Sequence, residues 1–149
     1  MSAFPPIEEL LAHRGAMLLV ERVIAREPSG IRVAATVDRK AWYAGSDGSM
    51  PGWIGIELMA QAIATFAGLA AHDRGERPRP GFLLGTRRYD AQCDRFAAQM
   101  TLEVSAHESF REPDGMSAFE CTIVHDGRVL ASATLKVFEP PDLEAFLAS

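Results

Sequence analysis

Three polar side chains on one apolar stretch of the chain could carry chemistry. Glu57, Gln61 and Thr65 follow one another at intervals of four residues within the segment GWIGIELMAQAIATFAGLAA, residues 52–71. In an α-helix this spacing places all three on one stripe. A carboxyl group enclosed by apolar residues is costly unless it is hydrogen-bonded, paired or protonated, and in its protonated form it can act as a general acid. The alternative is purely structural, with Glu57 and Gln61 hydrogen-bonded to each other and to a strand backbone.

The residues just before this stretch form a second candidate site. Pro51 suits the first turn of a helix, and Gly52 has no side chain, so we expect the Gly52 N–H to be open to a ligand. A carbonyl oxygen bound there would be polarised. Glu57 follows about 7.5 Å further along the helix. This separation would place its carboxyl group near the β-carbon of an acyl thioester bound at Gly52.

These residues resemble the motif of a known family. MPG (residues 50–52), four further residues and ELMAQ (residues 57–61) are similar to the helix motif of the hotdog-fold 3-hydroxyacyl-[acyl-carrier-protein] dehydratases. The stretch LLAHRGAMLLVERV (residues 10–23) resembles the opening motif of the same family. The segments PGWIGIELMAQAIATFAG (residues 51–68) and GFLLGTRRYDA (residues 81–91) look closer still to a dehydratase-like branch associated with aryl polyene and related polyketide-type gene clusters. The resemblance covers nearly the whole chain.

The resemblance implies an enzyme that dehydrates 3-hydroxyacyl thioesters on acyl carrier protein to trans-2-enoyl thioesters, in a fatty acid or polyketide-type pathway. In the family a His takes or relays the α-proton while a carboxyl group, here that of Glu57, protonates the leaving hydroxyl. The position of that His is occupied by Tyr43. His13 is the only histidine inside a shared motif, so we expect it to replace the missing group. No metal and no cofactor are implied.

The expected site therefore has two catalytic residues, Glu57 and His13, with Gly52, Gln61 and Tyr43 binding the substrate. His13 should lie within about 6 to 8 Å of Glu57, because one bound β-hydroxyacyl group must touch both. Tyr43 is the fallback for His13, although a phenol is a poor base at neutral pH unless a cation lies beside it.

Two other functions fit the same residues. Tyr43 in the His position favours a hotdog thioesterase, in which Glu57 would activate water or the acyl carbonyl. It equally favours a non-catalytic hotdog subunit that binds an acyl chain or a partner. The spacing from Gly52 to Glu57, with Gln61 one turn on, favours the dehydratase. Acyl chain length, and the choice between carrier-protein and coenzyme A substrates, are left open.

The elements that must position these residues are a hairpin, one long helix and four later strands. The 52–71 helix is apolar almost all round, which indicates that it is enclosed on every side. Asp126-Gly127 predicts a two-residue hairpin turn. The remaining expectations are short helices over residues 7–13 and 140–149, strands over residues 17–27, 31–38, 81–91, 100–109, 116–125 and 128–139, and a loop over residues 39–51.

This order predicts a single α+β domain over residues 1–149. An antiparallel sheet must cover its apolar face, and the long helix is the only candidate to cover it. The expected architecture is the hotdog fold, with the sheet wrapped around one central helix. One sheet edge stays open, which predicts a homodimer with a continuous sheet and with Glu57 buried at the subunit interface.

Composition excludes several classes of function. The chain has 149 residues, of which 48% are hydrophobic, a formal net charge of −5 and no block of Lys or Arg, which argues against a nucleic-acid surface. Residues 52–71 are long enough to cross a bilayer, but they are rich in Ala and Gly and contain Glu57, so no membrane span is expected. Two cysteines are too few for a disulfide framework, and Glu8 and Glu9 stand where a signal peptide would be basic, so we expect a cytoplasmic protein.

Basic residues gather after the long helix in an otherwise acidic chain. They could bind an acidic acyl carrier protein and the phosphate of its phosphopantetheine arm. The alternative is ordinary solvated surface charge. The residues concerned are Arg74, Arg77, Arg79, Arg87 and Arg88.

Overall fold

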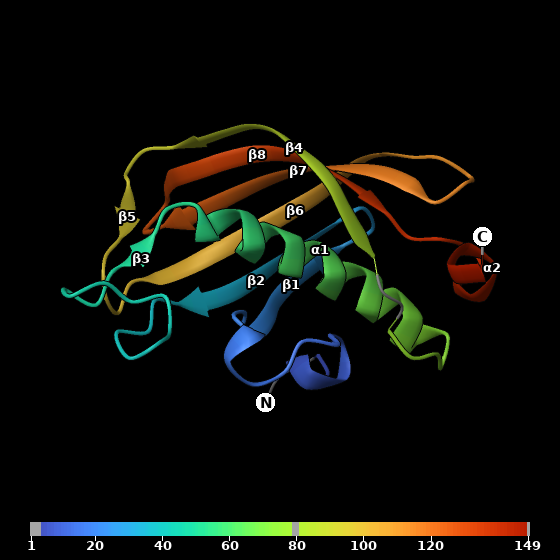
Figure 1. Cartoon of the computed structure of the whole chain (residues 1–149), viewed down its shortest axis with the longest axis horizontal. Coiled ribbons are helices and arrows are strands. Elements are labelled where there is room, and N and C mark those ends of the chain that lie inside the picture. Colours follow the sequence, from blue (N-terminus) through green and yellow to red (C-terminus); the bar gives the residue numbers. More distant parts are fainter. Residues whose placement is uncertain (1–3, 79–80, 149) are drawn as a thin grey trace.

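Six antiparallel strands form one sheet around a single long helix in the computed structural model, which describes residues 4–78 and 81–148 (Figure 1). The strand order across the sheet is β1-β2-β6-β7-β8-β4. This is the α+β hotdog architecture that the sequence predicts. The strands are β1 (Arg22–Glu27), β2 (Gly30–Thr36), β4 (Phe82–Ala91), β6 (Thr101–Arg111), β7 (Met116–His125) and β8 (Arg128–Phe138).

The β7–β8 hairpin turns where the sequence predicts it. Asp126 and Gly127 have φ values of 48° and 77°, in the left-handed region that a two-residue hairpin turn requires. His125 pairs with Arg128 directly across the turn. The turn thereby sets the register of β8, the strand on which the edge strand β4 is paired.

The central helix α1 (Ile54–Asp73) begins two residues later than the expected start at Gly52. Before it, β3 (Met50–Pro51) pairs with β5 (Arg95–Phe96) in a separate two-stranded ladder. The sequence pattern predicts only loop here, because a two-residue strand is too short to show alternation. Pro51 therefore belongs to a strand and not to the first turn of the helix.

The core lies between α1 and the concave face of the sheet. Leu58, Met59 and Ala62 of α1 are buried, as are the sheet residues that face them, among them Val104 and Ile123. By composition α1 could cross a membrane, but 67% of its most apolar window is buried inside the protein. Burial of this extent is typical of the core helix of a soluble protein.

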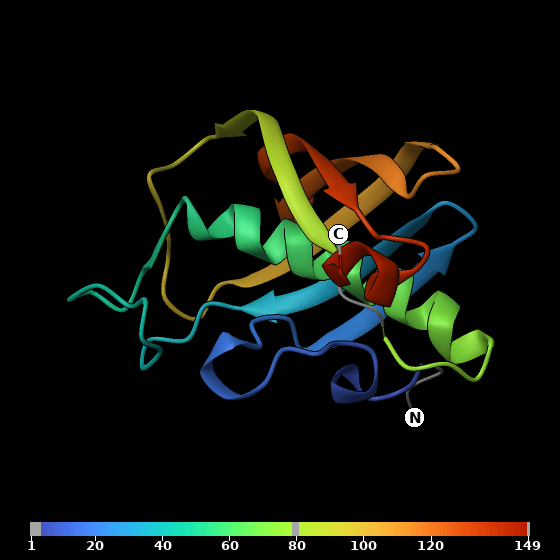
Figure 2. The same ribbon diagram turned by 45° about the vertical axis from the view of Figure 1, so that its right-hand side comes forward.

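The N-terminal segment packs along α1 on the side opposite to β4, in both views of the ribbon (Figures 1 and 2). A 3₁₀ turn at Ile7–Glu9 takes the place of the longer helix expected over residues 7–13, and a second 3₁₀ turn covers Gly15–Met17. The segment approaches α1 closely at Gly68, where a Cβ atom would overlap the carbonyl oxygen of Leu10. Gly68 thus allows the segment that carries His13 to reach the helix.

The edge of the sheet that β4 forms is open. Within the described ranges β4 pairs only with β8, and nearly every residue of β4 is exposed, including the apolar Leu83 and Leu84. An unpaired, apolar edge strand is a ready template for pairing with another chain.

The chain ends in the short helix α2 (Leu143–Ala148), as expected for the tail.

Candidate active site

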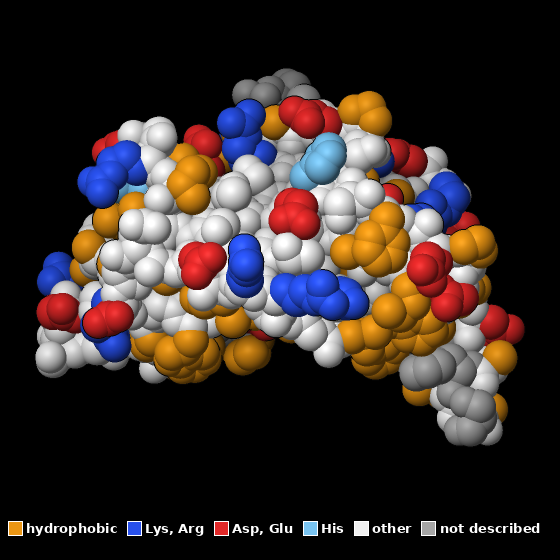
Figure 3. Space-filling view, turned by 90° about the horizontal axis from the view of Figure 1, so that it is seen from above, with side chains coloured by type: hydrophobic (Ala, Val, Ile, Leu, Met, Phe, Trp, Pro, Cys, Tyr) orange, Lys and Arg blue, Asp and Glu red, His pale blue; other side chains and the backbone are white. Residues whose placement is uncertain are grey.

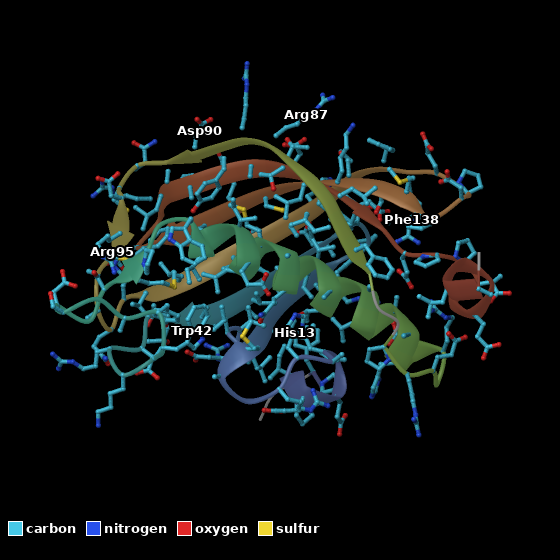
Figure 4. All side chains as sticks on the ribbon, in the orientation of Figure 1. His13, Trp42, Arg87, Asp90, Arg95 and Phe138 are labelled. Carbon is cyan, nitrogen blue, oxygen red and sulfur yellow. The ribbon has the colours of Figure 1, made fainter. Side chains whose placement is uncertain are left out.

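The structure brings His13 and Glu57 together. His13 Nε2 lies 3.6 Å from Glu57 Oε1, closer than the separation expected from the sequence. His13 belongs to the N-terminal segment, and Glu57 stands in the first turn of α1. Figure 4 shows His13 between that segment and the helix. The two residues thus place an imidazole and a carboxyl group within reach of one small substrate group.

The amide of Gln61 connects the two elements that carry this pair. Gln61 is fully buried on α1. Its Oε1 accepts hydrogen bonds from the N–H groups of Leu19 (2.9 Å) and Val20 (3.3 Å). Its Nε2 donates to the carbonyl of Met17 (2.7 Å) and to Glu57 Oε1 (3.0 Å). Gln61 therefore fixes the position of Glu57 relative to the N-terminal segment. These hydrogen bonds occupy both the oxygen and the nitrogen of its amide.

Arg14 organises the backbone of the segment around His13. One guanidinium nitrogen donates to the carbonyls of Leu11 (2.6 Å) and His13 (2.7 Å), and the other donates to the carbonyl of Glu8 (2.8 Å). Three carbonyls of an irregular stretch are thus bound by one planar group. Sequence reasoning missed this role, although Arg14 directly follows His13 in the family-like opening motif.

A cleft of about 780 Å³ leads away from His13 and Glu57. From Glu57 to Arg74 at the far end, α1 rises about 25 Å at 1.5 Å per residue. The side formed by α1 is largely apolar, because Ile63 and Phe66 line it together with four alanines. An elongated cleft with this lining fits an extended, chain-like ligand. The lining residues include Ala60, Ala64, Ala67 and Ala70 of α1, Leu83 of β4, Phe119 of β7, Val137 and Phe138 of β8, and Arg111.

The Gly52 N–H is not open to a ligand, which corrects the expectation from the sequence. It donates to the carbonyl of Asp94 at 2.7 Å. The cause is the β3–β5 ladder, which brings the chain around Asp94 against the start of α1. The Gly52 carbonyl in turn accepts a hydrogen bond from the Tyr89 hydroxyl. Gly52 therefore offers no oxyanion donor at this site.

Tyr43 is likewise not at the cleft. Its ring is buried in the core, and its hydroxyl accepts the N–H of Asp38 at 2.9 Å. Burial raises the pKa of this phenol above its ordinary value. The loop that carries Tyr43 turns the aromatic ring inward because the ring is a large apolar group. Tyr43 therefore serves the packing of the loop and is not placed to replace the missing His.

Glu57 is not buried within its own chain. Its side chain keeps 39% of its surface exposed at the mouth of the cleft, and that of His13 keeps 34%. The complete burial expected for Glu57 would require a second chain to cover this face. The carboxyl group nevertheless lines the cleft, where Gln61 and His13 are its neighbours.

The basic residues do not form one surface. Arg74 lines the far end of the cleft, whereas Arg87 points outward from β4, away from α1 (Figure 4). On the face seen in Figure 3, acidic and basic side chains are interspersed, and hydrophobic side chains gather along its margin. Arg79 lies outside the described residues. Among the residues described, a single basic field for an acidic partner is therefore absent from the face in Figure 3.

Comparisons with known proteins give one family match and several structural matches. A family model described as "ApeP-like: ApeP dehydratase" matches residues 5–148. Among solved structures, the dehydratase heterocomplex ApeI:P from Xenorhabdus doucetiae contains a chain that is 29% identical, with a TM-score of 0.88 and coverage of 97% of each chain. None of the curated proteins matches the sequence.

More distant structures share the fold alone. A mutant of the phenylacetic acid degradation protein PaaI from Thermus thermophilus is 23% identical, with a TM-score of 0.58 over 79% of this chain and 91% of that one. A hypothetical thioesterase with coenzyme A from Streptococcus pneumoniae is 13% identical, with a TM-score of 0.62 over 79% and 84%.

Proposed function

The chain belongs to the ApeP-like dehydratase family, and on that premise we propose that it removes water from 3-hydroxyacyl thioesters to form trans-2-enoyl thioesters in an aryl polyene pathway. The observation that carries this proposal is the approach of His13 to Glu57 at the end of an elongated cleft. The reaction removes a proton from C2 and the hydroxyl group from the adjacent C3. Two groups 3.6 Å apart can both contact the reacting end of one substrate.

The acyl chain of the substrate fits the cleft beyond the pair. With the reacting carbon atoms beside the His13–Glu57 pair, the rest of an extended acyl chain follows α1 along the cleft toward Arg74. We take acyl carrier protein, through its phosphopantetheine thioester, as the carrier of the substrate, and the cytoplasm as the place of the reaction.

A second hotdog chain completes the assembly in this proposal. The open edge of β4 and the exposed mouth of the cleft favour pairing with another sheet. The Xenorhabdus doucetiae relative is described as a dehydratase heterocomplex. The partner is therefore either a second copy of this chain, as its open edge suggests, or a different hotdog subunit. Sedimentation of the chain alone, which should show a homodimer at micromolar concentration, separates the two.

Incubation with a 3-hydroxyacyl-carrier protein tests the reaction itself. We expect the carrier-bound acyl group to lose the mass of one water molecule. Release of the free acid would instead identify a thioesterase, in which Glu57 activates water. An unchanged substrate, both with the chain alone and with its co-purified partner, would identify a subunit without catalytic function.

A further inference from the structure

The hydrogen bonds around Gln61 determine which of its atoms faces Glu57. The N–H groups of Leu19 and Val20 can only donate, and both point at one end of the Gln61 amide. That end must be the carbonyl oxygen, so the NH₂ end faces Glu57 Oε1 at 3.0 Å. Glu57 Oε1 is therefore a hydrogen-bond acceptor. A donor aimed at a carboxyl group favours its charged form.

The surroundings of His13 indicate which ring nitrogen carries its proton. Its Nδ1 is buried from solvent and has no hydrogen-bond partner among the described residues. A doubly protonated ring would carry an N–H there with neither an acceptor nor water, which is costly for a charged group. With the proton on Nε2 alone, the buried Nδ1 holds only a lone pair, and the N–H points toward Glu57.

The hydrogen-bond geometry therefore fits a Glu57 oxygen that accepts and a His13 ring whose single proton is on Nε2, 3.6 Å from that oxygen.

We propose that Glu57 is the base of the dehydration and that His13 is a neutral hydrogen-bond donor, the reverse of the roles that the family resemblance implies. This inference rests on the proposed function. The Glu57 carboxylate removes the C2 proton, and the electron pair of that bond forms an enolate at the thioester. His13 Nε2–H donates to the thioester oxygen, where the negative charge develops. His13 thus supplies the donor that the Gly52 N–H, bound to Asp94, cannot supply.

The second half of the reaction returns the proton. The enolate electron pair forms the C2–C3 double bond as the C3–O bond breaks. Protonated Glu57 gives the proton that it removed from C2 to the departing hydroxyl group, which leaves as water. Glu57 is again a carboxylate, and His13 has neither gained nor lost a proton.

Two substitutions at His13 distinguish a role as hydrogen-bond donor from a role as base. His13→Gln keeps a side-chain N–H near the place of Nε2 but cannot act as a base, whereas His13→Ala removes both. On a 3-hydroxyacyl-carrier protein we expect kcat to fall about 10²-fold in His13→Ala and to stay within about tenfold of wild type in His13→Gln. An equal loss in both variants would overturn the proposal.

A measurement that needs no turnover tests the ring directly. Nitrogen-15 NMR of the full-length protein at neutral pH reports which ring nitrogen carries the proton, and the His13→Gln spectrum identifies the His13 signals. We expect a proton on Nε2 only. A proton on Nδ1, or on both nitrogens, contradicts the proposal. If the ring is as expected but wild type forms no enoyl product, the proposed function fails, and the role of Glu57 as the base fails with it.

Discussion

His13 of the N-terminal segment and Glu57 of α1 face each other across 3.6 Å, and the buried amide of Gln61 connects the elements that carry them. The positions of both residues depend on contacts outside their own elements. The segment docks on the helix through a close approach at Gly68 and through the amide of Gln61, while the guanidinium of Arg14 holds the backbone of the segment itself. The integrity of the site therefore depends on residues that do not touch the substrate.

The first prediction concerns Gly68. A methyl group in Gly68→Ala would overlap the backbone oxygen of Leu10, which cannot move aside as a flexible side chain can. We expect a loss of about 1–3 kcal/mol in the free energy of unfolding, measured with urea, and a loss of activity as His13 is displaced. Gly85→Ala is the matched control because a Cβ there meets nothing, and it should stay within about 0.5 kcal/mol of wild type. Equal stability of the two variants would refute the docking geometry.

A second prediction concerns the Gln61 amide. Gln61→Leu leaves the N–H groups of Leu19 and Val20 without their acceptor and frees Glu57 from its donor. We expect the free energy of unfolding to fall by about 2–5 kcal/mol, since each buried unsatisfied group costs about 1–3 kcal/mol. Thr65→Val is the control, because the Thr65 hydroxyl only donates to the Gln61 carbonyl of the preceding turn. We expect the free energy of unfolding of Thr65→Val to fall by only about 1 kcal/mol. A comparable loss of stability in the two variants would contradict the bridging role of the amide.

Arg14 gives a third prediction, which separates positioning from stability. Arg14→Gln removes the donors to three backbone carbonyls at a partly exposed site, so the segment should shift while the fold persists. We expect kcat to fall about tenfold or more with KM nearly unchanged, because small displacements of a catalytic group are costly. Arg26→Gln, which removes an exposed ion pair with Asp73, should leave both constants unchanged. A rise in KM alone would point to substrate binding by Arg14.

The fourth prediction is a pH dependence of stability. Burial, and then the nearby Cys93, raise the pKa of Tyr89 from 10.0 to about 12. The unfolded phenol ionises near its ordinary value, so the stabilising contribution is complete below pH 10 and is lost as the pH rises toward 12. We expect Tm to fall across this window, and to fall less steeply in Tyr89→Phe. Parallel Tm curves for the two proteins would show that Tyr89 is not linked to folding.

Much of the fold follows from local sequence patterns. β7 and the turn at Asp126-Gly127 lie where alternation and turn chemistry predict them. The two-residue strands β3 and β5 escape prediction because they depend on a pairing between distant segments. The same pairing explains the error at Gly52, since only the folded chain brings the Asp94 carbonyl to its N–H.

The site is partly predictable in the same way. Glu57 and Gln61 follow from helical spacing, and His13 follows from its place in a family-like motif. Their mutual contact, the turning of Tyr43 into the core and the role of Arg14 require the tertiary structure, because each depends on a partner far along the chain or on a backbone path without regular periodicity.

The central claim is that the Glu57–His13 pair of this chain removes water from a 3-hydroxyacyl thioester. Intact-mass spectrometry of a 3-hydroxyacyl-carrier protein, incubated with wild type and with Glu57→Gln in parallel, tests it most directly. We expect wild type to remove the mass of one water molecule from the acyl group, and Glu57→Gln to do so at least about 10²-fold more slowly. Dehydration by Glu57→Gln at the wild-type rate, or release of free acid by wild type, would contradict the claim.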